Sequence, residues 1–304
     1  MPIARIPILQ SDAPGAIIGA EKGEGDMHFL YKFENEDLYY HHALDKQPAA
    51  GDFFRHAHEM CEVYGFIRGK GVYTVEGTPY PLGPGDILIM RPAEFHTLSI
   101  DTSQPYERIS FNFSPAILAG SDPEGLLLEP FFSRPLGREN LYHAKAFPEG
   151  SPMDLLREMS RRQPERGEQR LHIICCLFPL LAQIRRAYKQ KNADPAAGSG
   201  RAAQIIAYIN ENLTGHLSLE KLSADLFLSK SQITRLMRRA AGCSAGEYIT
   251  VKRLLLARRR MQAGEPPTAV WAACGFGDYT AFYRAYRKYY GASPSGKGRG
   301  TRET

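Results

Sequence analysis

The sequence has 304 residues, 43% of them hydrophobic and 23% charged, which excludes a largely disordered chain and leaves room for two domains with buried cores. Its charge is uneven: residues 200–304 hold 17 Lys and Arg against 7 Asp and Glu, whereas residues 1–199 hold 21 against 26. A polyanionic partner is therefore expected for the C-terminal third alone.

Residues 1–147 are predicted to form mainly β structure. Gly and Pro punctuate short β-prone runs, namely EVYGFI, GVYTVEG, DILIMR and ERISFNF. Strands at this spacing without long helical patterns indicate a sandwich or a small barrel.

Three histidines and a glutamate in this region form a candidate metal site. His56 and His58 are two positions apart, so an extended strand directs both side chains to one face. Glu62 opens the run EVYGFI, and His96 follows the strand DILIMR. Three imidazoles and one carboxylate suffice for a divalent transition metal such as Zn, Ni, Mn or Fe. The alternative is that they hydrogen-bond a polar ligand or satisfy the barrel interior.

These residues resemble the two motifs of the cupin fold. The first motif is approximated by Gly51, His56, His58, Glu62 and Gly69, and the second by Gly85, Asp86, Pro92 and His96. The spacing departs slightly, since four residues instead of five separate Gly51 from His56, and the stretch before His96 lacks the usual glycine. The resemblance implies a β-barrel with a binding site inside.

Aromatic residues of the same region are candidates for an effector pocket. With the four candidate metal ligands, the predicted lining comprises Phe54, Tyr64, Phe66, Tyr73 and Phe111. An aromatic wall with a few polar groups suits a sugar or an aromatic compound. The alternative for each aromatic is an ordinary core position.

Residues 148–191 change to a helical period. Apolar side chains recur every three or four positions at Leu171, Ile174, Phe178, Leu181, Ile184 and Tyr188. Pro179 is expected to kink this helix. Residues 192–200, NADPAAGSG, have the composition of a linker.

Residues 201–304 are predicted to be all helical and to carry one helix-turn-helix pattern twice, 49 positions apart. The segment SKSQITRLMRRAAG at 229–242 aligns with DYTAFYRAYRKYYG at 278–291, so that Arg235 pairs with Arg284 and Arg238 with Arg287. Between them, a helix from Ser244 to about residue 263 would be roughly 30 Å long, close to one DNA turn of about 34 Å. Both second helices can then enter successive major grooves.

The predicted DNA contacts are polar side chains of those two helices and their caps. They are Ser229, Lys230, Ser231, Gln232, Thr234, Arg235 and Arg238 in the first copy, and Asp278, Tyr279, Thr280, Tyr283, Arg284 and Arg287 in the second. The alternative is that these side chains only form a solvated basic surface. We favour DNA contact over this alternative because two capped copies occur in the same phase.

Residues 201–291 resemble the DNA-binding domain of the AraC/XylS family. The resemblance rests on YINENLTGHLSLEKLSADLFLSKSQITRLMRRAAGCSAGEYI, RLLLARRRM and CGFGDYTAFYRAYRKYYGASP. It implies a transcription factor that binds DNA as a dimer behind a cupin sensor, with the helices of 148–191 as the dimerisation region. Ser223 and Trp271 stand where the family has alanine, and the bulky Trp271 is expected to push two helices apart or to demand repacking.

The sequence thus predicts an α+β multidomain protein: a cupin-like β-barrel at 1–147, helices at 148–191, a linker at 192–200 and an all-α double helix-turn-helix domain at 201–304. The predicted partners are double-stranded DNA, a small-molecule effector and a second copy of the chain, with RNA polymerase as a further candidate. The alternatives are a metal-dependent dioxygenase or isomerase and a non-specific nucleic-acid packaging protein; we favour a regulator that is not an enzyme.

Neither secretion nor a membrane location is indicated. The N-terminal residues lack the apolar core of a signal peptide, and no window is long enough to span a bilayer, so a cytoplasmic location is expected. The five cysteines show no CxxC pair and no disulfide-like spacing, which favours buried thiols in a reducing compartment.

Overall fold

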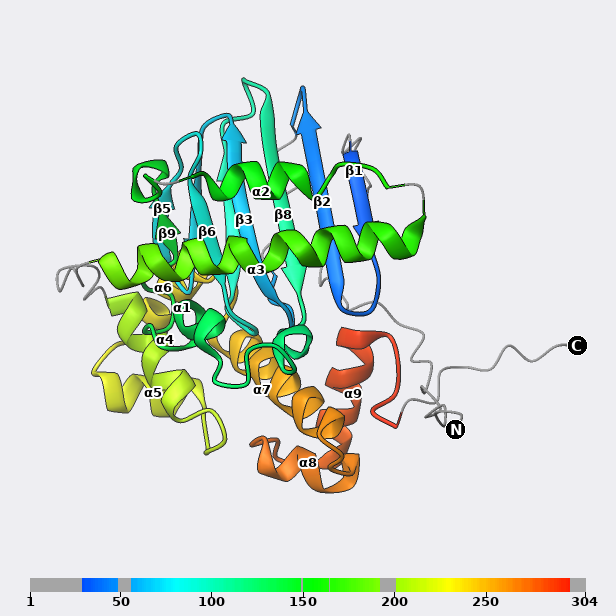
Figure 1. Ribbon diagram of the computed structural model, residues 1–304. Helices are drawn as coiled ribbons and strands as arrows, with labels where there is room; N and C mark the ends of the chain where they lie inside the picture. Colours follow the sequence, from blue (N-terminus) through cyan, green and yellow to red (C-terminus); the bar gives the residue numbers. More distant parts are fainter. Residues whose placement is uncertain (1–28, 49–55, 149, 164, 192–200, 296–304) are drawn as a thin grey trace, which may run out of the picture.

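The computed structural model describes residues 29–48, 56–148, 150–163, 165–191 and 201–295 (Figure 1). Its N-terminal part is β-rich and its C-terminal part is helical, as the sequence predicts. The larger sheet comprises β1 (Phe29–Glu34), β2 (Leu38–Asp45), β8 (Tyr106–Phe113), β3 (Cys61–Arg68), β6 (Ile87–Met90) and β9 (Leu141–Tyr142), in that spatial order. The smaller sheet comprises β5 (Thr78–Pro81), β4 (Gly71–Val75) and β7 (His96–Ile100).

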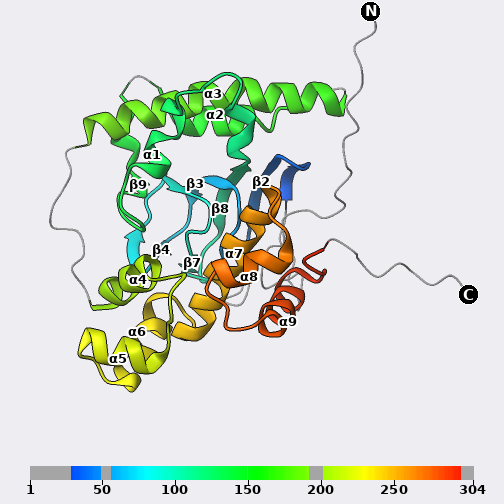
Figure 2. The same ribbon diagram turned by 90° about the horizontal axis from the view of Figure 1, so that it is seen from below.

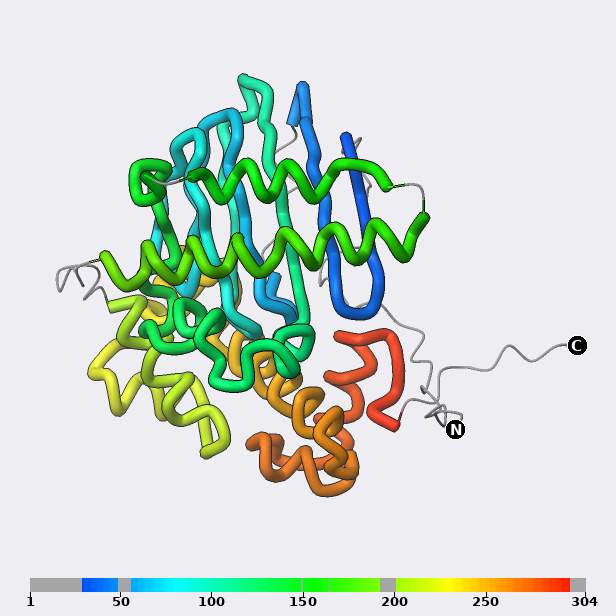
Figure 3. The backbone as a smooth tube through the Cα atoms, in the orientation of Figure 1, coloured from blue at the N-terminus to red at the C-terminus, as the bar shows by residue number. Residues whose placement is uncertain are grey.

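The strand pairs are antiparallel, and β8 is inserted between β2 and β3 although it follows both by many residues (Figure 3). The two sheets face each other across an aromatic interior. The ring of Tyr64 in β3 lies 4.9 Å from that of Tyr73 in β4. Because side chains alternate along a strand, Glu62 and Phe66 share the inward direction of Tyr64. This arrangement confirms the predicted cupin-like class of fold.

Two helices cover the other face of the larger sheet, namely α2 (Pro152–Glu158) and α3 (Arg166–Gln190), as Figures 1 and 2 show. Their apolar side chains share one core with Val63, Ile109 and other buried residues of the sheet. The approach is close at Gly65, where an added Cβ would lie 2.8 Å from Met153 Cε. Short turns complete this part: η1 (Pro115–Leu118), η2 (Leu126–Leu128), α1 (Glu129–Phe132) and η3 (Ala144–Ala146).

The structure corrects the predicted position of Phe111. Its side chain belongs to the core between the larger sheet and α3, not to the interior between the sheets. Its neighbours in β8, Ser110 and Asn112, point inward and bond to Glu62 and His58. Alternation along the strand therefore turns Phe111 away from the predicted pocket.

The predicted helix of residues 171–188 is present within α3, and its apolar stripe is divided between the core and the surface. Leu181 and Ile184 are buried, but Leu171 is 60% exposed, and Ile174 and Phe178 are only partly buried. The side chains packed on the sheet also include Ile173, Leu177 and Leu180. The helix is apolar on two neighbouring faces, so the period alone does not tell which face meets the sheet. Helix α3 continues through Pro179.

Within residues 201–295, the structure has six helices: α4 (Arg201–Glu211), α5 (Leu219–Leu226), α6 (Lys230–Ala240), α7 (Ala245–Gln262), α8 (Pro267–Ala273) and α9 (Tyr279–Tyr290). They build two small cores, one around Ile233 and Met237 of α6 and one around Phe282 and Tyr286 of α9. Helix α7 contributes to both cores and separates the two helix-turn-helix units (Figure 2). In the described ranges, no helix combines the length and the hydrophobicity needed to cross a membrane.

Candidate DNA-binding surface and candidate metal centre

The first predicted recognition helix is α6, and its first turn is fixed by a capping box. The hydroxyl of Ser229 accepts a hydrogen bond of 3.2 Å from the Gln232 amide, and the Gln232 side chain accepts one of 2.9 Å from the Ser229 amide. Thr234 donates its hydroxyl to the Lys230 carbonyl at 2.8 Å. These predicted contact residues therefore also hold the start of the helix in place.

The arginines of α6 are available to a partner. Ile233 and Met237 are fully buried, whereas Arg235 and Arg238 are exposed on the opposite side of the helix. Lys230 is exposed as well, and its ammonium lies 2.5 Å from Glu220 on α5. The surface of α6 is thus basic and polar.

The second predicted recognition helix, α9, repeats this arrangement. Asp278 caps it by accepting a hydrogen bond of 2.7 Å from the Ala281 amide. Phe282 is fully buried, while Arg284 and Arg287 are exposed. Thr280 is also exposed, and the Tyr279 and Tyr283 rings lie 6.2 Å apart at the helix start.

Helix α7 lies between the two units and has 18 residues, which corresponds to about 27 Å of helix. Ser244 is its N-cap and forms a capping box with Glu247. Trp271, on α8, is partly buried against the core that contains Val270 and Phe282. The indole is therefore part of the packing of the second unit.

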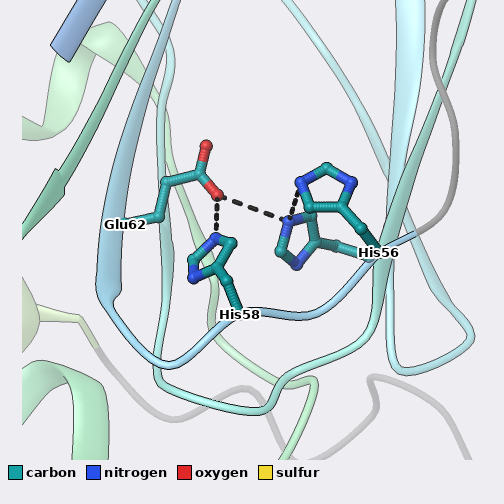
Figure 4. Close-up of side chains that lie close together, drawn as sticks. His56, His58 and Glu62 are labelled. Carbon is teal, nitrogen blue, oxygen red and sulfur yellow. Dashed lines mark hydrogen bonds and ion pairs between the residues drawn. The ribbon is translucent and has the colours of Figure 1, made fainter. Parts of the chain in front are cut away.

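The four candidate metal ligands meet between the two sheets. Figure 4 shows three of them, His56, His58 and Glu62. His56 forms an antiparallel bridge with His96 at the start of β7, while Glu62 comes from β3 of the larger sheet. One ligand atom from each of the four residues lies within 4.8 Å of all the others. His58 Nε2 is 3.0 Å and His96 Nε2 is 3.4 Å from Glu62 Oε2, and the Nε2 atoms of His56 and His96 are 3.0 Å apart.

Backbone carbonyls orient two of the imidazoles. His58 Nδ1 donates to the Met60 carbonyl at 3.0 Å, and His96 Nδ1 donates to the Glu94 carbonyl at 2.8 Å. A carbonyl only accepts, so in a neutral ring the hydrogen sits on Nδ1 and the lone pair of Nε2 points into the cluster. The centre thus gathers nitrogen lone pairs and a carboxylate, which is the ligand chemistry of a divalent transition metal.

The electrostatics of the cluster also fit such a metal. Burial alone would raise the pKa of Glu62, but the adjacent His58 side chain and the neighbouring imidazoles outweigh burial and hold this pKa below its usual range. Burial, together with the charge of His56, lowers the pKa of His96 well below its ordinary value. An ionised carboxylate and a neutral imidazole are the forms that bind metals.

Sequence reasoning missed two polar neighbours of the cluster. Ser110 donates to Glu62 Oε1 at 2.8 Å, and the Asn112 amide lies 3.0 Å from His58 Nε2. The signal was present in the strand ERISFNF, because Ser110 and Asn112 alternate with Ile109, Phe111 and Phe113. Polar side chains at every second position of a strand that is apolar on its other face indicate a polar interior.

The aromatic residues of the predicted pocket are buried in the same interior. Tyr64, Phe66 and Tyr73 belong to one cluster with Tyr106, and the hydroxyls of Tyr64 and Tyr106 lie 2.5 Å apart. The Tyr73 ring is 5.8 Å from that of His96. Phe54 lies outside the described residues. The effector pocket therefore stays a prediction.

Facing sheets with a polar cluster between them, followed by two capped basic helices, define a DNA-binding transcription regulator with a ligand-binding domain. The family model of the AraC-like ligand binding domain matches residues 43–181, and that of a helix-turn-helix domain matches residues 222–298. The chain belongs to the AraC family of transcription regulators.

Two relatives match most of the chain, and a third matches a shorter stretch at higher identity. The HTH-type transcriptional activator RhaS of Klebsiella pneumoniae (strain 342) is 21% identical over 256 residues, which cover 83% of this chain and 90% of RhaS. The Msm operon regulatory protein of Streptococcus mutans is 24% identical over 263 residues, covering 84% and 90%. The probable transcriptional regulator LumQ of Photobacterium leiognathi is 34% identical over 89 residues, covering 29% and 36%.

Proposed function

We propose that the chain reads specific double-stranded DNA through the polar side chains of α6 and α9 predicted from the sequence. The observation that carries this proposal is the repeated surface, in which exposed Arg235 and Arg284 occupy equivalent positions on two helices with buried apolar faces. Helix α7, with 18 residues and about 27 Å of helix, lies between the two units, and we propose that it places the two recognition helices about one DNA turn of roughly 34 Å apart. Arginine reads guanine bidentately in the major groove, and hydroxyl groups bind phosphates.

The test begins with selection of a preferred site from random duplexes by the purified full chain. Arg235→Ala and Arg284→Ala should each weaken binding to that site by about 1–3 kcal/mol, the value of one bidentate guanine contact. Arg161→Ala is the matched control, because its side chain is 74% exposed on the β-rich side of the molecule. Equal affinity for selected and random DNA at fixed salt would instead support non-specific packaging.

We further propose that a small-molecule effector, of sugar or aromatic chemistry, binds in the interior around His56, His58, Glu62 and His96. Tyr64, Phe66 and Tyr73 are buried next to these side chains, and Phe54 completes the predicted lining. The same four residues would hold a divalent transition metal (Zn, Ni, Mn or Fe). A bound metal would supply a fixed positive charge that orients an anionic or hydroxylated group.

His58→Ala should abolish Zn²⁺ binding to the full chain in a competition titration with a chromogenic chelator. His143→Ala provides the control, since its side chain is 57% exposed and outside the cluster. Both variants should bind the selected DNA normally without metal. Unchanged Zn²⁺ affinity in His58→Ala would show that the ion binds elsewhere.

The family consists of transcription regulators, and we propose that this chain has no catalytic activity of its own. Turnover of a candidate effector by the full chain would contradict this.

We also propose the four-part division predicted from the sequence, with boundaries after residues 147, 191 and 200. We also propose that the protein is located in the cytoplasm, where it would act on DNA, and that RNA polymerase is a further partner.

We propose that two copies associate through α3. Leu171 is 60% exposed, and the partly buried Ile174 and Phe178 continue this apolar face. A dimer would present four recognition helices and raise DNA affinity through effective concentration.

A further inference from the structure

Two carboxylates of the β-rich part contact the DNA-binding helices. Glu76 lies in the turn between β4 and β5, and Glu59 lies in the segment that leads into β3. Both contacts join residues more than 170 positions apart in the chain. They therefore join the β-rich part, the described residues of 29–191, to the helical part, residues 201–295. These are called the sensor part and the reader part below.

Glu76 is buried against α7. Lys252 donates to Glu76 Oε1 at 2.6 Å, and the Tyr248 hydroxyl donates to Oε2 of the same carboxylate. Glu76 is 3% exposed and Lys252 is 5% exposed, so this is an ion pair removed from solvent. Lys252 also donates to the Ala93 carbonyl at 2.5 Å. A buried pair of this kind favours one relative placement of its two elements.

The neighbouring Gly77 shows how closely the turn approaches α4 and α6. Its backbone has φ +79°, and an added Cβ would lie 3.0 Å from Ala240 Cβ and 3.1 Å from Ile206 Cδ1. The absence of a side chain is what admits the turn at this point.

Glu59 contacts the second helix-turn-helix unit through α7 and α9. Arg258 of α7 lies 3.2 Å from Glu59 Oε2, and the Tyr290 hydroxyl of α9 lies 3.4 Å from Oε1. The Arg258 guanidinium also stacks over the Tyr290 ring at 4.6 Å. The second recognition helix is thus attached to the sensor part through its C-terminal end.

The residues that contact the reader alternate with the candidate metal ligands. His56 and His58 point into the cluster, whereas Ala57 is fully buried in the core of the first helix-turn-helix unit and Glu59 pairs with Arg258. The same holds for β7, where Phe95 precedes His96. Phe95 lies in the core of that unit, with its ring 4.9 Å from Tyr248, and its amide donates to Glu76 Oε1 at 2.9 Å. The backbone of residues 56–59 and 95–96 therefore lies between the cluster and the DNA-binding helices.

We infer that a divalent transition metal at His56, His58, Glu62 and His96 stabilises the docked arrangement of the DNA-binding helices. This inference rests on the proposed metal site. Metal bonds of about 2.0–2.1 Å from nitrogen would fix the backbone of residues 56–58 and 96. That backbone carries Ala57, Glu59 and Phe95, so fixing it favours the contacts with α7 and α9. Linkage is reciprocal, and docking must therefore raise metal affinity by the same factor.

The test measures Zn²⁺ affinity of the full chain by chelator competition. Lys252→Met and Arg258→Met each remove a contact between the two parts without touching a candidate ligand. Each should lower Zn²⁺ affinity by about fivefold or more, the usual lower range of such coupling. Arg259→Met is the matched control, because Arg259 is the exposed neighbour of Arg258 on α7, and its affinity should equal that of the unsubstituted chain.

The sign of the effect separates docking from simple electrostatics. Removal of a nearby positive charge by itself would raise affinity for a dication. Raised or unchanged affinity in both interface variants therefore overturns the inference. If a variant does not fold, amide hydrogen exchange of the unsubstituted chain gives the answer: Zn²⁺ should slow exchange within α7 and α9, and unchanged exchange overturns the inference.

The same samples distinguish a failure of the proposed metal site from a failure of the proposed coupling. A full chain that binds its selected DNA but no Zn²⁺ overturns the metal site and this inference, while the proposed reading of DNA stands. A full chain that binds Zn²⁺ with equal affinity in all variants retains the metal site and loses only the coupling.

Discussion

At the scale of single residues, buried polar groups hold the candidate centre in place. Glu94 is the main example, since Arg134 donates to both of its carboxylate oxygens at 2.8 and 2.6 Å, and the Gly137 amide donates to Oε1 at 2.9 Å. The carbonyl of Glu94 in turn accepts the hydrogen of His96 Nδ1. Burial by itself would raise the pKa of Glu94, but the charge and hydrogen bonds of Arg134 hold it below its usual value.

Arg134→Met should therefore destabilise the fold by about 3–5 kcal/mol, because it removes the two-pronged partner of the buried Glu94 carboxylate and leaves Arg91, whose Nε lies 3.6 Å from Oε1, as the remaining cation beside it. The pKa of Glu94 is lower in the folded state, so its contribution is present above the ordinary carboxyl pKa and is lost as the pH falls below it. Urea unfolding at neutral and acidic pH measures both effects. A loss of stability that is equal at both pH values would contradict this account.

Trp271 gives a second prediction at this scale. Its partly buried indole packs against the core of the second helix-turn-helix unit, although its size suggested a disturbance there. Trp271→Ala should lower the free energy of unfolding by about 2–4 kcal/mol, somewhat less than for a fully buried Trp. Trp271→Phe serves as the conservative control, and an unfolding curve of Trp271→Ala that matches the unsubstituted chain would show that the indole contributes no packing.

At the scale of elements, helix limits were predictable because their signals are local. Ser229, Ser244 and Asp278 cap their helices as the sequence predicts. The face that α3 turns to the sheet was not predictable, since helix period leaves two apolar faces equivalent. The inward direction of His56, His58 and Glu62 followed from strand alternation, but their meeting with His96 required the pairing of distant strands.

Ser229→Ala removes one half of the α6 capping box, so it should cost about 1 kcal/mol of stability. Specific DNA affinity should fall together with stability, because the frayed first turn carries predicted contact residues. Ser121→Ala is the control, as Ser121 is exposed in a turn of the β-rich part and lies outside the predicted DNA contacts. A Ser229→Ala chain as stable as the control would contradict the role of the cap.

The exposed face of α3 gives the prediction for dimerisation. Leu171→Glu should convert a dimer to monomers in sedimentation analysis, because it places a charge within an apolar contact. Glu168→Gln provides a control on an exposed position one turn earlier. Unchanged sedimentation of Leu171→Glu would locate the dimer contact elsewhere.

At the scale of the whole molecule, the sensor and the reader share buried contacts. Sequence patterns did not indicate the pair between Glu76 and Lys252. Each of the two residues stands in a polar or amphipathic segment of the kind that is usual at a protein surface. Its burial arises only when the β4–β5 turn meets α7.

Thermal unfolding offers a direct check: Glu76→Gln combined with Lys252→Met should be more stable than Lys252→Met alone, because the double change leaves no unpaired buried charge. Additive losses would indicate that the two groups do not interact.

The alternation of imidazoles and docking side chains along residues 56–59 has a consequence for how such a chain can diverge. Substitutions can remove either set alone. A single inserted or deleted residue in this segment, however, would turn the side chains on one side of the change to the opposite side of the backbone, and ion ligation and helix attachment would disappear in one step.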